Sequence, residues 1–260
     1  MTRPHRARKR FGQHFLIDSG IIADIVDSVA PARDETVVEI GPGQAALTDA
    51  LQRSDARLHT IEFDRDLAAR LRERFQDADN VTLHEADALS FDFASLGDSL
   101  RIVGNLPYNI STPLLFHLID SLDCIEDMHF MLQKEVVDRM AAEPGSKRFG
   151  RLTVMLGCYC DVEPLFDVPP SAFSPPPKVQ SSVVRLLPQA PRGAGIADSA
   201  LLARIVSQAF SQRRKTLHNA LRDLVSNAEL ETVGISPGAR AETVSIEGWI
   251  ALANAQADRS

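Results

Sequence analysis

Two patterns of hydrophobic and polar positions alternate along the first half of the chain. A helical pattern over residues 19–30, with Ser19 as its expected N-cap, comes first. Short apolar runs rich in β-branched residues, typical of buried strands, then occupy residues 36–40, 57–63, 80–89 and 100–107. Apolar residues at helical spacing follow the first, second and fourth of these runs. Alternating strands and helices predict a parallel sheet covered by helices.

Three more strands are expected in the second half of the chain. Residues 127–140 begin as a strand and continue as a helix. Residues 150–169 and 181–188 have the composition of two final strands, which a Pro-rich stretch separates. The pattern therefore predicts a sheet of about seven strands.

The character of the chain changes after Pro188. A linker rich in Gly, Pro and Ala follows, and the remaining residues have helical periodicity without strand patterns. We therefore expect an α/β domain over residues 1–188 and a small all-helical domain over residues 189–260.

Composition places the chain among ordinary globular proteins. Of its 260 residues, 44% are hydrophobic and 24% charged, and no apolar run approaches the roughly 20 residues that span a bilayer. The basic N-terminus lacks the features of a secretory signal, so we expect a cytoplasmic protein. We also expect the protein to be a monomer. The three cysteines and seven histidines have no metal-binding spacing, which favours buried thiols and no metal site.

The net charge of −7 alone would argue against a nucleic-acid partner. Basic residues nevertheless gather in three segments, at residues 3–10, 147–151 and 213–222. Any one of them is more simply a solvated surface or a tail, but three segments can also converge on one surface in the folded protein.

The residues that follow the expected strands carry the candidate chemistry, because ligands of open parallel sheets bind at the carboxyl ends of the strands. Glu39, Gly41 and Gly43 follow the first strand in a glycine turn that lets the backbone approach a ligand. Glu62 ends the second strand, about 20 residues later, where an acidic side chain can accept hydrogen bonds from both hydroxyls of a ribose. Asp87 follows the third strand and either caps a helix or accepts a hydrogen bond from an adenine amine. Together these residues predict a nucleoside pocket.

Two classes of cofactor fit such a pocket. A dinucleotide usually lies over G-x-G-x-x-G, and here Ala46 occupies the position of the third glycine. The acidic Glu39 beside the turn suits a cationic, phosphate-free ligand better than a diphosphate. S-adenosylmethionine is such a ligand and is the favoured cofactor, while a dinucleotide stays open as the alternative.

The segment "NLPY" at the end of the fourth strand predicts the reaction. The exocyclic amine of a planar base is a poor nucleophile and needs hydrogen-bond acceptors rather than a strong base. The side-chain carbonyl of Asn105 and the main chain after it can hold such an amine, and Pro107 stiffens the loop. Tyr108 offers a surface on which a base can stack. The alternative is a turn with a packed tyrosine.

At this level of detail the chain resembles the ribosomal RNA adenine N6,N6-dimethyltransferases over nearly its whole length. The resemblance rests on "RKRFGQHFL", "VEIGPGQAALT", "IEFDRDLAARL", "EADAL", "GNLPYNISTPLLFHL", "MLQKEVVDRM", "VPPSAFSPPPKVQSSVVRL" and "FSQRRKTLHNAL". It implies a seven-stranded Rossmann-like methyltransferase sheet, S-adenosyl-L-methionine as cofactor, and dimethylation of two adjacent adenosines near the 3′ end of 16S ribosomal RNA in the small ribosomal subunit.

The resemblance also assigns roles to individual residues. The implied cofactor-contacting positions are His14, Leu16, Gly41, Glu62, Asp87 and Asn105. Asn105, Tyr108 and Phe173 are the implied catalytic positions, with Phe173 either a second stacking surface or a packed loop aromatic. Arg213, Arg214 and Lys215, on an expected helix, and the region around Lys147 are the implied RNA contacts.

Two other functions stay open. One is an assembly factor for the small ribosomal subunit, whose binding matters more than its methylation, which the separate basic segments would serve. The other is a DNA adenine methyltransferase or an antibiotic-resistance ribosomal methyltransferase, which would use the same "NLPY" chemistry but not the matching terminal segments.

Overall fold

The computed structural model describes residues 14–107, 110–189 and 195–257. It forms two compact units, one made of residues 1–137 and 163–187, the other of residues 138–162 and 188–260. The predicted boundary at Pro188 coincides with one border between these units. The units differ from the predicted domains in that residues 138–162 group with the C-terminal helices.

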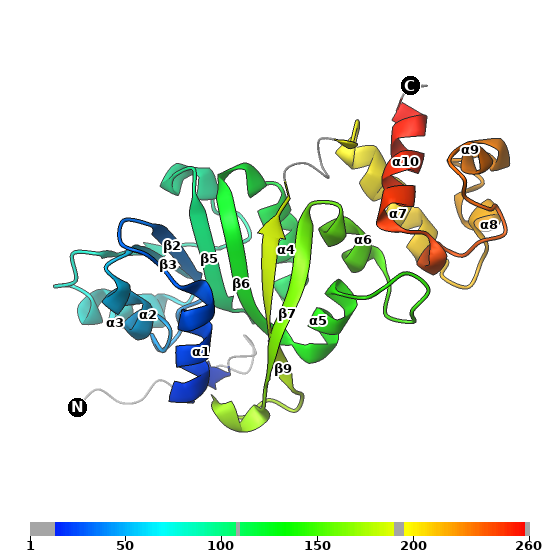
Figure 1. Cartoon of the computed structure of the whole chain (residues 1–260). Helices are drawn as coiled ribbons and strands as arrows, with labels where there is room; N and C mark the ends of the chain where they lie inside the picture. Colours follow the sequence, from blue (N-terminus) through cyan, green and yellow to red (C-terminus); the bar gives the residue numbers. More distant parts are fainter. Residues whose placement is uncertain (1–13, 108–109, 190–194, 258–260) are drawn as a thin grey trace. The chain divides into compact units, whose positions relative to one another are not determined.

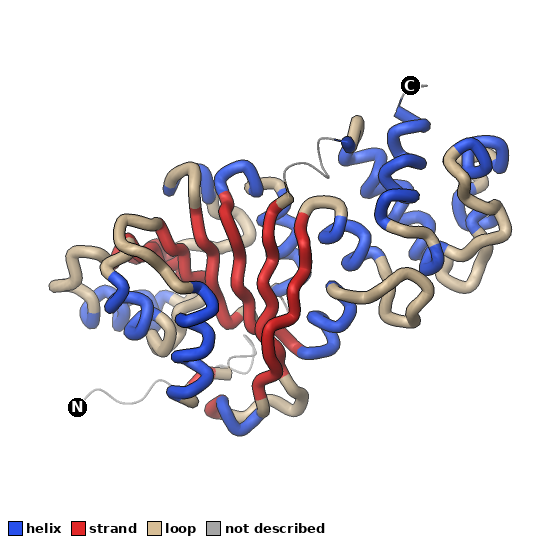
Figure 2. Tube along the Cα trace, viewed as in Figure 1, coloured by secondary structure: helices blue, strands red, loops and turns tan. Residues whose placement is uncertain are grey.

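A seven-stranded sheet forms the centre of the first unit (Figures 1 and 2). Its strands are β2 (Thr36–Ile40), β3 (Arg57–Glu62), β4 (Val81–Glu85), β5 (Leu100–Asn105), β6 (Ile125–Gln133), β7 (Cys160–Val168) and β9 (Ser181–Pro188), in the spatial order β4-β3-β2-β5-β6-β9-β7. Strands β4, β3, β2, β5 and β6 run parallel to one another, and β9 is antiparallel to β6. The predicted mostly parallel, seven-stranded sheet is confirmed.

The order of the strands places a ligand site at one edge of this sheet. The chain runs outward from β2 to β3 and β4, then returns to add β5 on the other side of β2. Such a switch in direction leaves a crevice beyond the carboxyl ends of the two central strands. In register, Ile40 lies beside Ile61 and Glu39 beside Val103, so that β2, β3 and β5 end at the same edge.

Helices cover the sheet and bury it. They are α1 (Ser19–Val29), α2 (Thr48–Leu51), α3 (Arg65–Arg74), α4 (Ser111–Ile119) and α5 (Lys134–Met140). In Figure 1, α1 lies in front of the sheet and α4 behind it. All five residues of β2 are buried, as expected of a parallel strand with both faces covered. Side chains of α1, including Ile25 and Val29, pack in one apolar cluster with Val37, Val103 and Val183 from the sheet.

The N-cap of the first helix lies one residue earlier than the sequence pattern suggests. Asp18, rather than the predicted Ser19, is the N-cap, and its carboxylate accepts hydrogen bonds from the backbone N–H groups of Gly20 and Ile21. A carboxylate at this position also suits the positive end of the helix dipole. Before this helix, β1 (Phe15–Leu16) pairs antiparallel with β8 (Phe173–Ser174) in a separate two-stranded sheet.

The second unit is helical among its described residues apart from the start of β7. It contains α6 (Arg151–Gly157), α7 (Ser199–Ser211), α8 (Leu217–Leu221), α9 (Asn227–Thr232) and α10 (Ile246–Ala257). The rings of Phe149, Phe210 and Trp249 are tilted against one another in its core, with centroids 6.3 and 5.9 Å apart. The prediction of a strand over residues 150–169 is wrong in its first half, because α6 precedes β7 there. Residues 152–157 of α6 are all buried, so no polar face marks them as a helix.

The three consecutive cations at 213–215 lie in the turn between α7 and α8, not on a helix as predicted. Thr216 has an extended backbone and pairs with Arg240, which interrupts the helical pattern.

Within the part of the chain that the structure describes, no helix is both long and apolar enough to cross a membrane. Cys124, Cys158 and Cys160 are free and buried, as predicted.

Candidate active site

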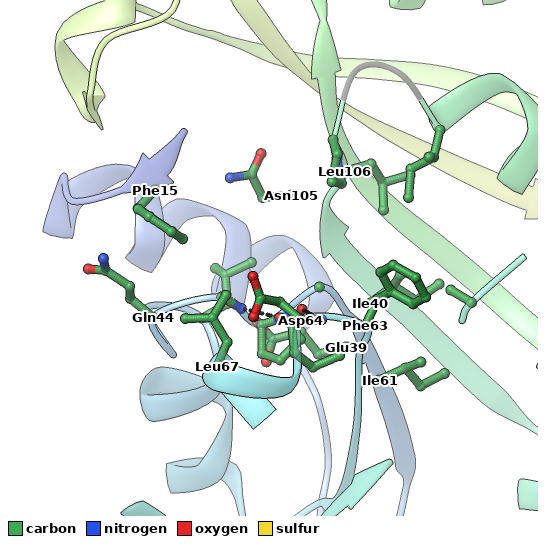
Figure 3. A pocket seen from close by; sticks show the side chains of 18 of the residues that line it. Phe15, Glu39, Ile40, Gln44, Ile61, Phe63, Asp64, Leu67, Asn105 and Leu106 are labelled. Carbon is green, nitrogen blue, oxygen red and sulfur yellow. Dashed lines mark hydrogen bonds between the residues drawn. The ribbon is translucent and has the colours of Figure 1, made fainter. Parts of the chain in front are cut away.

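A pocket opens at the carboxyl edge of the sheet, beyond β2, β3 and β5. It has a volume of about 350 Å³, within the range of small-molecule sites. In Figure 3, Asn105 and Phe15 lie on one side of it, and Gln44, Asp64 and Leu67 on the other. The six positions at which the sequence predicts cofactor contacts all line this one pocket: His14, Leu16, Gly41, Glu62, Asp87 and Asn105.

The glycine turn after β2 forms the floor of the pocket. Gly41 and Gly43 have φ angles of +69° and +57°, in the left-handed region that favours glycine. A Cβ atom on Gly41 would have no atom within 4 Å, so it would project into open space. A Cβ on Gly43 would approach the ring of Phe15 to 3.2 Å. The absence of a side chain at Gly41 therefore keeps the backbone open to the pocket. At Gly43 it lets the ring of Phe15 pack against the backbone.

Glu62 is fixed in place at the end of β3. One carboxylate oxygen accepts a hydrogen bond from the Gly43 N–H at 3.2 Å, and the other accepts one from the Asp64 N–H at 2.8 Å. Only 6% of the residue is exposed, and this burial raises the pKa of the carboxyl group. Each oxygen keeps acceptor capacity, so the group is oriented for a ligand with two neighbouring hydroxyls.

Glu39 has a different role from the predicted one. It is 2% exposed, and Thr48 in α2 donates a hydrogen bond of 2.6 Å to its carboxyl group. Burial raises the pKa of Glu39 to about 8. A carboxyl group that keeps its proton at neutral pH supplies no negative charge for a cationic ligand. The acidity of Glu39 therefore does not support the predicted choice of cofactor.

Asp87 follows β4 and is exposed at the rim of the pocket. Its Oδ1 accepts a hydrogen bond of 3.0 Å from the Leu89 N–H, which closes a local turn. The helix-cap alternative raised from the sequence is not confirmed, because a turn rather than a helix follows Asp87; the observed role is that of a turn cap. It is compatible with a ligand contact, because one oxygen holds the turn and the carboxylate has further acceptor positions.

Asn105, the last residue of β5, projects over the pocket (Figure 3). Its Nδ2 donates a hydrogen bond of 3.0 Å to the main-chain carbonyl of His14. A carbonyl only accepts hydrogen bonds, so the nitrogen of the amide must face His14, and the Oδ1 atom faces away from it. Pro107 also lines the pocket. Tyr108, the predicted stacking residue, lies outside the described residues.

Phe173 is in a different environment from these residues. It is 3% exposed and packs in the same apolar cluster as Leu16 and Met131. It is not among the residues that line the pocket. A side chain buried to this extent offers no face to a base, so this conformation favours the packed-aromatic interpretation of Phe173 over the stacking one.

Two of the three basic segments, at residues 147–151 and 213–222, belong to the second unit and differ in their partners, while residues 3–10 lie outside the described residues. Arg213 donates a hydrogen bond of 2.8 Å to the Glu242 carboxylate and another to the main-chain carbonyl of Lys147. Arg148 pairs with Asp138 at 3.1 Å. Arg214 and Lys215 are exposed. The region of Lys147 and the triplet at 213–215 therefore meet, as the sequence allowed. The contact between them is the hydrogen bond from Arg213 to the Lys147 carbonyl.

Comparison with known proteins identifies the family. A family model described as ribosomal RNA adenine dimethylase matches residues 4–258. The chain belongs to the ribosomal RNA adenine dimethylase family. The ribosomal RNA small subunit methyltransferase A of Nitrosococcus oceani is 57% identical over 254 residues, which cover 96% of each chain. The protein of the same name from Dechloromonas aromatica is 56% identical over 250 residues, covering 96% of this chain and 98% of its own.

Solved structures agree with this assignment. A dimethyladenosine transferase from Plasmodium falciparum superposes with a TM-score of 0.80 at 26% identity, covering 92% of this chain and 96% of its own. The 23S rRNA methyltransferase ErmE superposes with a TM-score of 0.71 at 27% identity, covering 93% and 98%. This ribosomal RNA adenine dimethylase family member is therefore an S-adenosylmethionine-dependent methyltransferase with a Rossmann-like fold, as predicted.

The pocket of this family member fits its cofactor. The open space above Gly41 admits a ligand against the backbone, and the fixed carboxylate of Glu62 faces the same pocket. Apolar side chains, among them Leu67 and Leu89, complete walls against which a base can pack.

Several residues at this dimethylase site were not predicted from the sequence, among them Phe15, Phe63 and Gly104. Phe15 and Phe63 line the pocket, and Phe63 is 60% exposed. A Cβ atom on Gly104 would lie 2.7 Å from the carbonyl oxygen of Ile40, so only glycine allows β5 to approach β2 this closely. An apolar residue directly after the strand-ending Glu62 was a usable signal for Phe63. The need for glycine at 104 depends on the neighbouring strand and has no local signal.

Proposed function

We propose that the protein dimethylates N6 of two adjacent adenosines near the 3′ end of 16S ribosomal RNA, in the small ribosomal subunit. The observation that carries the proposal is the position of Asn105, whose side-chain oxygen is turned away from His14 at the edge of a nucleoside-sized pocket. Relatives that match nearly the full chain are named ribosomal RNA small subunit methyltransferase A, which supports this choice of RNA over that of the 23S enzyme.

Asn105 holds the reacting amine in this proposal. Its Oδ1 accepts one hydrogen of the adenine amino group, and a main-chain carbonyl of the following loop accepts the other. Holding both hydrogens lets the nitrogen become pyramidal and directs its lone pair. A strong base is not required, because the proton can leave to water after transfer.

His14, Leu16, Gly41, Glu62, Asp87 and Asn105 would hold the cofactor. S-adenosylmethionine, when bound, supplies an electrophilic methyl group attached to a sulfonium. Glu62 would accept hydrogen bonds from ribose hydroxyls with a carboxylate that Gly43 and Asp64 already fix. Asp87 would accept a hydrogen bond from the base amine at the rim.

The RNA would contact the second unit through its exposed cations, Arg214 and Lys215, with Lys147 nearby in the loop that Arg213 holds. Phosphate contacts of this kind position an RNA without reading its sequence. We further propose that the protein acts in the cytoplasm as a monomer.

The decisive experiment uses small subunits that lack the modification. They are incubated with the protein and methyl-labelled S-adenosylmethionine, and the modified nucleotides are mapped. We expect two N6,N6-dimethyladenosines next to each other near the 3′ end of the 16S RNA. Label at another position, or none, contradicts the proposal. The Asn105→Ala variant should bind the cofactor but lose about 100-fold or more in turnover.

A role in subunit assembly is the second candidate function. The observation that favours it is that the exposed cations belong to a unit separate from the one with the pocket. Cells with Asn105→Ala are compared with cells that lack the protein. Equal defects in small-subunit maturation favour methylation as the main function, and a milder defect in the variant favours binding.

A further inference from the structure

The segment from His14 to Asp18, which we name the N-terminal strap, is attached to the first unit at several points. Within it, β1 pairs with β8 in register, Phe15 beside Ser174 and Leu16 beside Phe173. The N–H groups of Ile17 and Asp18 both donate to the carbonyl of Ala172, at 2.9 and 3.3 Å. The strap is therefore fixed to the segment around β8 by main-chain hydrogen bonds.

The side chain of His14 anchors the first residue of the strap. Its Nδ1 lies 2.8 Å from the carbonyl oxygen of Pro175. Since a carbonyl only accepts hydrogen bonds, Nδ1 must carry the hydrogen, whichever form the ring has. This contact continues the attachment that β1 and β8 begin, and it fixes the position of the main chain at residue 14.

Two further side chains hold the middle of the strap. The ring of Phe15 packs on the glycine turn, because a Cβ on Gly43 would touch two of its atoms at 3.2 Å. Leu16 is 5% exposed and belongs to the apolar cluster beneath the sheet. Side-chain packing as well as main-chain hydrogen bonds therefore hold the strap in place.

The strap in turn fixes Asn105, which is 91 positions away in the sequence. The hydrogen bond from Asn105 Nδ2 ends on the main-chain carbonyl of His14. The orientation of the amide, and with it the direction of Oδ1, therefore depends on where the strap holds this carbonyl. Without this acceptor the amide would be free to turn over, which exchanges an acceptor for a donor at the place of the amine.

We propose that His14 is a positioning residue for Asn105: its carbonyl selects the productive orientation of the amide, and its ring, bound to Pro175, keeps that carbonyl in place. The inference rests on the proposed function insofar as Asn105 holds the target amine. It assigns to the N-terminal strap a part in the chemical step that is distinct from lining the cofactor pocket.

Two substitutions of His14 separate the anchoring hydrogen bond from the size of the side chain. In His14→Asn, the amide Nδ2 is as many bonds from Cα as the ring Nδ1 and can donate to Pro175. His14→Leu has a carbon at that position and cannot. Both variants keep the main-chain carbonyl, so a loss of turnover at saturating cofactor that is larger in His14→Leu than in His14→Asn reflects the loosened anchor.

We expect kcat at saturating cofactor and RNA to fall about 10- to 100-fold in His14→Leu, and His14→Asn, which keeps the anchoring hydrogen bond, to recover most of that loss. A KM for the RNA that stays at the parent value would place the loss in the chemical step. A cofactor dissociation constant, measured by calorimetry, separates binding from turnover. If His14→Leu changes only this constant and keeps the parent kcat, the inference is wrong.

A second measurement needs neither substrate nor cofactor. The side-chain NH2 group of Asn105 is observed by NMR, and its signals are assigned by their absence in Asn105→Ala. In the parent and in His14→Asn the two protons should have well separated shifts, because one is hydrogen-bonded. In His14→Leu the separation should shrink. Unchanged signals in His14→Leu overturn the inference, even if the protein proves to methylate another RNA.

A third pair of variants loosens the strap without changing a pocket residue. Ile17 is 58% exposed and does not line the pocket. Ile17→Pro removes the N–H that donates to Ala172, while Ile17→Ala keeps it. We expect Ile17→Pro to lower kcat and to change the Asn105 NMR signals, and Ile17→Ala to do neither. A parent-like Ile17→Pro in both measurements contradicts the inference.

Discussion

Thr48 donates a hydrogen bond of 2.6 Å to the carboxyl group of Glu39, which is almost completely buried beneath the glycine turn. The bond joins the start of α2 to the end of β2, on either side of Gly41 and Gly43. The conformation of the turn therefore depends on a buried acidic group. Whether this group is protonated depends on its burial in the folded protein.

The stability of the protein should fall as pH rises through neutrality because of Glu39. Burial raises the pKa of this group from 4.5 to about 8. Between these values the folded protein keeps a proton that the unfolded chain has released. The stabilising contribution is thus complete below pH 4.5 and is lost as the pH approaches about 8.

Glu39→Gln tests this dependence, because glutamine can accept the hydrogen bond from Thr48 and does not titrate. One unit of pKa shift corresponds to about 1.4 kcal/mol, so the free energy of unfolding of Glu39→Gln relative to the parent should rise by more than about 1 kcal/mol between pH 5.5 and 8.5. Urea denaturation of the cofactor-free proteins measures it. A difference that does not change with pH would show that Glu39 is ionised in the folded protein.

Gly104 should be intolerant of even the smallest side chain. An alanine Cβ there would lie 2.7 Å from the Ile40 carbonyl oxygen, so the ends of β2 and β5 would have to separate. We expect Gly104→Ala to lose about 1 to 3 kcal/mol of stability and to bind S-adenosylmethionine more weakly, since both strands end at the pocket. Denaturation and calorimetry measure the two effects. Gly195→Ala is the control, because a Cβ at Gly195 would contact no atom within 4 Å.

Much of the fold and of the pocket follows from local sequence patterns. The strands β2, β3, β4 and β5 are short apolar runs with clear ends, and the residues after them meet because parallel strands end at one edge. The positions of Gly41, Glu62 and Asn105 could therefore be inferred without tertiary information.

The errors arise where the environment, rather than the local pattern, decides. Helix α6 is buried along residues 152–157, so its sequence lacks a polar face and resembles a strand. The cations at 213–215 continue a helical spacing, yet α7 ends at Ser211 before them, and Thr216 after them pairs with Arg240. The sequence predicts a charged Glu39, but the burial of this residue and its hydrogen bond with Thr48 depend on tertiary packing. Neither has a local signal in the sequence.

Arg213 and Arg214 should contribute to RNA binding in different ways, although they are adjacent. Arg214 is exposed, so Arg214→Ala should weaken RNA binding and reduce the slope of log affinity against log salt by about 0.7 to 0.9, the loss of one phosphate contact. Arg213 is bound to Glu242 and to the Lys147 carbonyl. Arg213→Ala should leave the slope nearly unchanged.

Arg213→Ala should instead weaken the structure of the loop around Lys147, which Arg213 holds through the Lys147 carbonyl. The N–H of Gly145 in that loop donates to the Glu242 main-chain carbonyl. Its hydrogen exchange should become faster in Arg213→Ala and stay parent-like in Arg214→Ala. Equal salt slopes for the two variants would mean that Arg213 is itself a phosphate contact.

Arg101 should stabilise the sheet without affecting the pocket. Its guanidinium donates to both carboxylate oxygens of Asp127, at 3.1 and 2.6 Å, and to Glu35 at 3.1 Å. These hydrogen bonds raise the pKa of Arg101, and the Asp127 side chain is only 2% exposed. Arg101→Met would leave this buried carboxylate without its main partner, at a cost of about 3 to 5 kcal/mol. Because Arg101 is at the start of β5 and Asn105 at its end, the cofactor dissociation constant should not change under conditions where the variant is folded.

Replacing Asp127 with Asn in the same variant should recover part of the loss, since no buried charge then lacks a partner. If Arg101→Met is as stable as the parent in urea denaturation, Arg185, which lies 3.7 Å from the Asp127 carboxylate, rather than Arg101 compensates the charge of Asp127.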